Sequence, residues 1–158
     1  MRKLKLIISL AIPLSVGFIG SLFTNPAIKD GWYETLKKPA LVPPSWVFPV
    51  VWTILFILMG LALYLVWQKS GKKIRAQDKH LAFLLFAGQL LLNIWWSILF
   101  FYVQRPSWAL LEIVPLWLAI LATIFVFEKI DRRAGWLLWP YLLWVSFAVY
   151  LNNAIALG

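Results

Sequence analysis

The sequence contains no cysteine, one histidine and only six acidic residues among its 158 positions. The absence of cysteine excludes disulfides, thiolate metal sites and thiol catalysis. A metal site at His80 would need two or three further ligands, and no candidate ligands lie nearby in the sequence. No Ser/His/Asp set, carboxylate pair or glycine-rich phosphate loop can be assembled either. These absences argue against a hydrolytic or phosphoryl-transferring enzyme, and we expect no metal and no required cofactor.

Charged residues are scarce as well. They make up 13% of the chain, whereas 63% of the residues are hydrophobic and the mean hydropathy is +0.83. A soluble domain usually has roughly 25% charged residues, and a globule of this size could not bury so much apolar surface. The composition therefore predicts a protein whose solvent is lipid.

Five apolar runs each approach the roughly 20 residues that an α-helix needs to cross a bilayer. Unbroken runs of this length are typical of helices and not of the short alternating strands of membrane barrels. We expect an all-α membrane protein in which residues 1–158 form a single domain with five spanning helices. The predicted spans are approximately residues 4–23, 47–67, 81–101, 108–127 and 135–157.

The first connection, residues 24–46, is longer than the other three. It contains Pro39, Pro43 and Pro44, which fix φ and oppose helix formation, so it is predicted to be a semi-rigid, extended loop. The same loop carries apolar side chains that we expect to pack onto the bundle as a lid: Trp32, Tyr33, Leu36 and Leu41.

The basic residues lie in the gaps between the apolar runs. Eleven of the 15 fall on the side of the N-terminus and four on the side of the proline-rich loop. The positive-inside rule then places the N-terminus in the cytoplasm of a bacterial or archaeal cell. A bacterial or mitochondrial outer membrane, where the rule has no force, is the alternative. This distribution indicates contacts with the bilayer and not with nucleic acid.

Eleven tryptophans are too many for an interfacial belt alone. In an antiparallel bundle, many indoles and most polar groups within the spans meet in the half next to the proline-rich loop. Trp144, Ala148 and Asn152 form one helical stripe there, with a small residue in the middle. We predict an aromatic ligand cavity under the lid; the alternative is that the polar groups only join helices. The other residues that converge are Trp52, Asn93, Trp96, Ser97, Trp108 and Glu112.

Glu112 is the only acidic residue inside a predicted span. Three interpretations remain open: the carboxylate reaches the membrane surface, pairs with Arg105, or contacts a ligand or a proton.

Three ordered blocks of sequence resemble the translocator protein family, also called tryptophan-rich sensory proteins. The blocks are Trp32-Tyr33-x-x-Leu36-x-Lys38-Pro39-x-x-x-Pro43-Pro44-x-Trp46, Leu92-Asn93-x-Trp95-Trp96, and Pro140-Tyr141-Leu142-x-Trp144-x-x-Phe147-Ala148-x-x-Leu151-Asn152. The resemblance extends over nearly the whole chain. It implies a five-helix bundle, a homodimer, and binding of porphyrins such as protoporphyrin IX and heme. Benzodiazepine-type and isoquinoline ligands are also implied, with cholesterol for animal members.

The residues that the resemblance assigns to the ligand pocket overlap with the cavity expected from convergence. Together with Ser97, they form the predicted binding site: Tyr33, Trp52, Asn93, Trp96, Trp108, Trp144, Ala148 and Asn152. Val42 occupies a loop position that is histidine in animal members. The C-terminal cholesterol motif lacks the basic residue that should follow its tyrosine, Tyr150, so sterol binding there is unsupported.

Three functions are compatible with this resemblance. The leading hypothesis is a membrane receptor or sensor for tetrapyrroles. The first alternative is a transporter of porphyrins or sterol-like ligands. The second is an enzyme that degrades porphyrin in light, as reported for bacterial relatives, with Trp52 and Trp144 as the reacting indoles. No other catalytic residues are expected.

Overall fold

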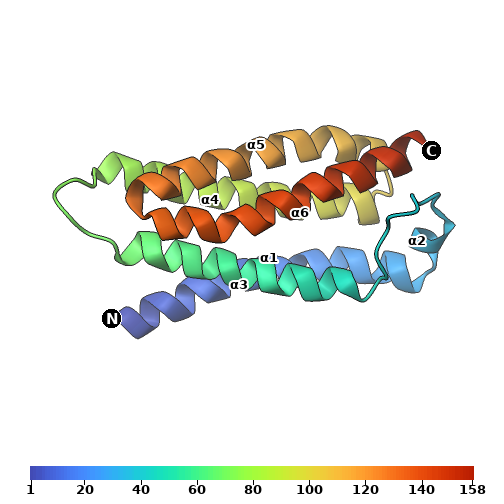
Figure 1. Ribbon diagram of the computed structural model, residues 1–158. Coiled ribbons are helices and arrows are strands. Elements are labelled where there is room, and N and C mark those ends of the chain that lie inside the picture. Colours follow the sequence, from blue (N-terminus) through green and yellow to red (C-terminus); the bar gives the residue numbers. More distant parts are fainter.

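The computed structural model describes residues 1–158 and contains five long helices, a short helix and no strand (Figure 1). All five long helices are long and apolar enough to cross a membrane. The predicted five-helix membrane bundle is therefore confirmed. The helices are α1 (Arg2–Lys29), α2 (Trp32–Thr35), α3 (Val47–Gln68), α4 (Ala76–Ser97), α5 (Pro106–Ile130) and α6 (Arg132–Leu157).

The long helices are antiparallel to their neighbours in sequence, so the connections gather at two ends (Figure 1). The N-terminus, the α3–α4 loop and the α5–α6 turn lie at one end, which we call the basic end. The short helix α2, the α4–α5 link and the C-terminus lie at the other, which we call the lid end. The lid itself is residues 30–46.

The first helix continues beyond its predicted end, through Pro26 to Lys29. Pro26 lies in the last turn, where its missing N–H removes only one helical hydrogen bond. Gly31 then reverses the chain with a φ of 77°, a left-handed conformation that glycine adopts without steric cost. At 28 residues, α1 is longer than the roughly 20 needed to span the hydrocarbon.

The last turn of α4 widens into a π-helix, η1 (Ile98–Tyr102). Such turns hold one extra residue and occur often at functional sites. Here the widened turn directs the neighbouring rings of Phe100 and Phe101, whose centroids are 4.8 Å apart, toward the interior of the lid end. The chain then reverses at Gln104, which has a φ of 56°.

The lid packs onto this π-helical turn. The ring of Trp32 meets Phe100 edge-on at 5.9 Å, and Tyr33 lies 6.1 Å from Phe101. Leu36 also packs there, whereas Leu41 is 70% exposed. The expectation of a lid is therefore correct for the first half of the loop but wrong for Leu41.

The two halves of the bundle are packed differently. The main apolar core lies toward the basic end, between residues 55–66 of α3, 82–90 of α4, 113–130 of α5 and 134–145 of α6. Helix α1 lies against α3 at Gly60, where an added Cβ would be 2.8 Å from the backbone of Leu10 and Ser9. Toward the lid end the helices enclose a cavity instead of a core.

A buried carboxylate closes the basic end. Asp131 caps α6 by accepting a hydrogen bond from the backbone N–H of Arg133 at 3.0 Å. The side chains of Arg133 and Lys69 donate to it at 3.1 Å each. The hydrogen bonds from Arg133, together with that from Lys69, outweigh the effect of burial and lower the pKa of Asp131 from 3.8 to about 2. Asp131 therefore ties the α5–α6 turn to the end of α3 as an ion.

Candidate ligand-binding site

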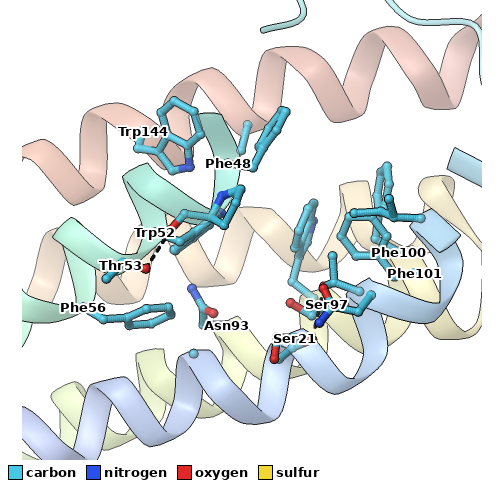
Figure 2. Close-up of a pocket in the computed structure, with 18 of the residues that line it drawn as sticks. Ser21, Phe48, Trp52, Thr53, Phe56, Asn93, Ser97, Phe100, Phe101 and Trp144 are labelled. Atoms are coloured by element: carbon cyan, nitrogen blue, oxygen red, sulfur yellow. Dashed lines mark hydrogen bonds between the residues drawn. The ribbon is translucent and has the colours of Figure 1, made fainter. Parts of the chain in front are cut away.

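The cavity in the lid end has a volume of about 640 Å³, within the range of small-molecule binding sites. Its walls come from α1, α3, α4 with η1, and α6, and the lid contributes Tyr33, Ser45 and Trp46. Figure 2 shows Trp52, Asn93 and Trp144 pointing into the same space from three different helices. The side facing lipid is not fully closed, because Phe18 of α1 and Trp46 before α3 line the cavity and are still 68% and 69% exposed.

The structure brings together most of the residues predicted to bind ligand. Trp108 is the exception. It lies in the first turn of α5 on the outer face, is 59% exposed and does not line the cavity. Helix α5 is separated from the cavity by α4 and α6, which it packs against, so no residue of α5 reaches the lining. The predicted residues that do line the cavity are Tyr33, Trp52, Asn93, Trp96, Ser97, Trp144, Ala148 and Asn152.

Aromatic rings form most of the wall. Trp52 stacks on Phe56 at 5.5 Å, and Trp96 stacks on Phe100 at 5.1 Å. Across the cavity, Trp144 meets Phe48 edge-on at 5.8 Å. Each pair holds one indole in place by contact with a phenyl ring. The site can therefore present flat aromatic faces in fixed orientations.

Asn93 belongs to a buried chain of hydrogen bonds that the sequence did not reveal. Its Nδ2 donates to the hydroxyl of Tyr141 at 3.0 Å, and this hydroxyl donates to Oε1 of Gln89 at 2.8 Å. Tyr141 and Gln89 are each only 1% exposed. The amide nitrogen of Asn93 is thus directed into the protein, away from the cavity.

Asn152 is also bonded within the protein. Its Oδ1 accepts from the indole N–H of Trp96 at 3.0 Å, and its Nδ2 donates to the backbone oxygen of Pro106 at 2.8 Å. This side chain joins α4, α5 and α6 at the lid end. Trp96 and Asn152 therefore satisfy one another, in line with the alternative interpretation that polar groups in spans join helices.

Three indole N–H groups in the lining make no hydrogen bond. The N–H groups of Trp96, Trp117 and Trp139 donate to other side chains. Those of Trp46, Trp52 and Trp144 make no hydrogen bond in the structure, and all three residues line the cavity. Because Trp46 is 69% exposed, Trp52 and Trp144 are the interior indole donors available to a carbonyl or carboxylate of a ligand.

At the lid, Tyr33 is covered by a charged pair. The Nζ of Lys38 lies 4.4 Å from the centre of the Tyr33 ring and 3.0 Å from a carboxylate oxygen of Glu34. Burial raises the pKa of Tyr33 above its usual value of 10, and the charge of Glu34 raises it further. Its phenol is therefore a neutral hydrogen-bonding group at neutral pH.

Helix α1 supplies a wall that sequence reasoning did not assign. Four of its lining residues are small or hydroxylated and recur at helical spacing: Gly17, Gly20, Ser21 and Thr24. An added Cβ at Gly17 would come within 2.6 Å of the Phe56 ring, so this glycine is required for the fit of α1 against α3. The small residues at i and i+4 were the signal that could have identified this face.

Glu112 is buried in α5, and neither carboxylate oxygen has a hydrogen-bond partner. It forms no ion pair with Arg105, so that interpretation is wrong. It also does not line the cavity. No group of three or more His, Cys, Asp or Glu side chains is placed to hold a metal ion.

Comparison with known proteins agrees with this architecture. The TspO/MBR family model matches residues 9–157. A tryptophan-rich protein TspO of Chlorobaculum tepidum is 47% identical over 152 residues, covering 96% of this chain and 94% of the relative. Another, of Archaeoglobus fulgidus, is 39% identical over 99% of this chain and 98% of the relative. The translocator protein of Homo sapiens is 36% identical over 87% of this chain and 80% of the relative. With five spanning helices and a family match along almost its whole length, this chain is an integral membrane protein of the TspO/MBR family.

Proposed function

We propose that the protein is a membrane receptor that binds tetrapyrroles, such as protoporphyrin IX and heme, in the lid-end cavity. The observation that supports this most is the set of indoles around one apolar space, with Trp52, Trp96 and Trp144 contributed by three helices. Their faces suit a flat macrocycle, and the free N–H groups of Trp52 and Trp144 suit its carboxyl groups. Benzodiazepine-type and isoquinoline ligands, which are flat and apolar, would use the same surfaces.

Heme would be held here without an axial ligand from a histidine. The only histidine, His80, is exposed near the start of α4 at the basic end, away from the cavity. The macrocycle and not its metal would be recognised. One chain supplies all the lining residues, so a homodimer, which we also propose, is not needed to complete the site.

Light-dependent breakdown of bound porphyrin is the second candidate. It is favoured by the positions of Trp52 and Trp144, which line the cavity without a hydrogen-bond partner at their nitrogens and would contact an excited pigment directly. The chemistry would belong largely to the pigment. A transporter is favoured only by the partly open side next to Phe18.

Quenching of tryptophan fluorescence by protoporphyrin IX, in nanodiscs and in the dark, tests the receptor. We expect saturable quenching that Trp144→Phe and Asn93→Ala weaken. The control is Trp136→Phe, because Trp136 is exposed to lipid near the basic end and does not line the cavity. Quenching that rises linearly with porphyrin concentration and is the same in both variants as in wild type would mean that the pigment only partitions into lipid.

Illumination of the same samples separates the other functions. Loss of the porphyrin absorption band in light, dependent on Trp52 and Trp144, would favour the enzyme. Net movement of porphyrin into sealed proteoliposomes would favour the transporter.

A further inference from the structure

We infer that Tyr141 and Gln89 hold the Asn93 amide with its oxygen toward the cavity, so that the site selects ligands carrying an N–H or O–H donor. This inference rests on the proposed function, because it concerns which apolar ligands the same cavity prefers. Asn93 acts on the ligand, and Tyr141 and Gln89 are positioning residues.

The direction of the hydrogen bonds combines the single hydrogen on the Tyr141 hydroxyl with the orientation of the two amides, in which Nε2 of Gln89 has no hydrogen-bond partner. That hydrogen goes to Oε1 of Gln89 at 2.8 Å, which leaves the hydroxyl oxygen to accept from Nδ2 of Asn93 at 3.0 Å. Gln89 and Asn93 are one helical turn apart on α4 and face the same side. Because Tyr141 and Gln89 are almost completely buried, water cannot readily replace either bond.

The oxygen of Asn93 is then the atom left for a ligand. Asn93 lines the cavity, and its Oδ1 makes no hydrogen bond within the protein. This oxygen is also accessible, because the fully buried polar atoms without a hydrogen-bond partner do not include it. A carboxylate would be repelled at this position, because it is also an acceptor. Asn93 therefore does not serve as a partner for a ligand carboxylate.

Three hydroxyl groups of the lining, those of Ser21, Thr24 and Thr53, also present acceptors. Ser21 donates to the backbone oxygen of Phe18 at 2.6 Å, and Thr53 donates to that of Pro49 at 2.7 Å (Figure 2). Thr24 likewise donates within its own helix at 3.1 Å. These hydroxyls use their hydrogens on helix carbonyls and can offer a ligand only oxygen lone pairs. They add acceptors on α1 and α3 to the one that Asn93 supplies on α4.

A ligand without a donor would leave Oδ1 of Asn93 unpaired against an apolar surface. An unpaired buried acceptor is more costly than the net gain of an average hydrogen bond, so such selection can be strong. For a neutral donor and acceptor we expect a preference of about tenfold.

Two matched porphyrins can measure this preference. Hematoporphyrin dimethyl ester carries two alcohol O–H donors and no carboxylate, and its di-O-methyl ether has the same macrocycle without those donors. We expect wild-type protein in nanodiscs to bind the alcohol about tenfold more tightly, and Asn93→Leu to bind both equally. The control is Ser146→Ala, which removes a bond of 2.8 Å between α5 and α6 outside the cavity and should keep the wild-type ratio.

The positioning role is tested by Gln89→Leu. Without Gln89, Oδ1 of Asn93 can accept the Tyr141 hydrogen once the amide turns, and the turned amide presents Nδ2 to the cavity. The alcohol and ether oxygens can both accept from Nδ2, so the preference for the alcohol should be lost. Tyr141→Phe releases the amide and should likewise bring the ratio close to one. A general loss of folding would instead abolish saturable binding of both porphyrins.

Three outcomes would overturn the inference. Saturable wild-type binding with a ratio near one would refute donor selection while leaving the proposed function intact. A wild-type ratio retained in both Gln89→Leu and Tyr141→Phe would refute the positioning role. Failure of both esters to bind saturably while protoporphyrin IX does bind would refute the inference alone, and failure of protoporphyrin IX as well would refute the proposed function.

Discussion

Replacement of Gly60 by alanine would show whether close contact between α1 and α3 holds the cavity wall in place. Gly60 lies in the middle of α3, and its added Cβ would be 2.8 Å from the Cα of Leu10 and from the backbone oxygen of Ser9. Ordinary Cβ contacts begin at about 3.4 Å, so the two helices would have to separate by about 0.6 Å or more. Backbone atoms cannot move aside as a flexible side chain does.

The expected magnitude is the difference between two opposing effects. Alanine in a helix interior is more favourable than glycine by roughly 1 kcal/mol. Overpacking of a tight contact usually costs about 1–3 kcal/mol and can cost more when backbone is involved. The difference is a loss of about 0–2 kcal/mol, and because the contact is with backbone we expect Gly60→Ala to lower the free energy of unfolding by about 1–2 kcal/mol. The shift of α1 should also weaken porphyrin binding, because Gly17 and its neighbours form one wall of the cavity.

Gly88 provides a matched control within another spanning helix. A Cβ added to Gly88 would meet nothing within 4 Å, so Gly88→Ala should keep the helix-propensity gain without any steric cost. Unfolding in detergent, followed by circular dichroism, would give both stabilities. Equal stability of the two variants would show that the α1–α3 contact adjusts to an added methyl group at little cost, and would refute the prediction.

Two further predictions concern the basic end and the orientation. Since the pKa of Asp131 is about 2 in the folded protein and 3.8 is its ordinary value, its ionised form stabilises the fold by about 2 kcal/mol above pH 4. This stabilisation should decline as the pH falls toward 2. Asp131→Asn should lose it at neutral pH and differ little from wild type near pH 2, as measured by unfolding across that range. Because the chain lacks cysteine, single substitutions Ser70→Cys and Ala40→Cys can report topology. An impermeant maleimide added to whole cells should label Ala40→Cys and spare Ser70→Cys; the reverse pattern would invert the predicted orientation.

The five spans could be predicted from sequence because lipid imposes a simple rule of about 20 apolar residues on each. The helix ends could not, because packing decides how far a helix continues past the apolar run. Pro26 illustrates this: a proline predicts an interruption, yet α1 continues past both Pro13 and Pro26 to Lys29. The π-helical turn at Ile98–Tyr102 likewise has no signal in residue type.

The cavity residues could be predicted where the antiparallel order of the helices alone determines how deep a residue lies in the membrane. Trp52 lies early in its helix and Asn93 lies late in the next, so both are near the lid end. Depth does not set rotation about a helix axis, which is why Trp108 was assigned to the cavity although it faces outward. Gln89 carried a signal that was not used: a glutamine inside a span requires a partner, and Tyr141 lay in a block already singled out.

The polar groups of the cavity matter more here than they would in a soluble protein. A porphyrin that leaves water gains free energy from the hydrophobic effect whether it enters the cavity or the surrounding bilayer. Lipid tails are as apolar as the lining, so this term cannot hold a ligand in the protein. What remains is the fit against the rings around Trp52 and Trp144, together with hydrogen bonds that lipid tails cannot offer. The few polar atoms that face the cavity, Oδ1 of Asn93 among them, are therefore where discrimination between one flat apolar molecule and another must arise.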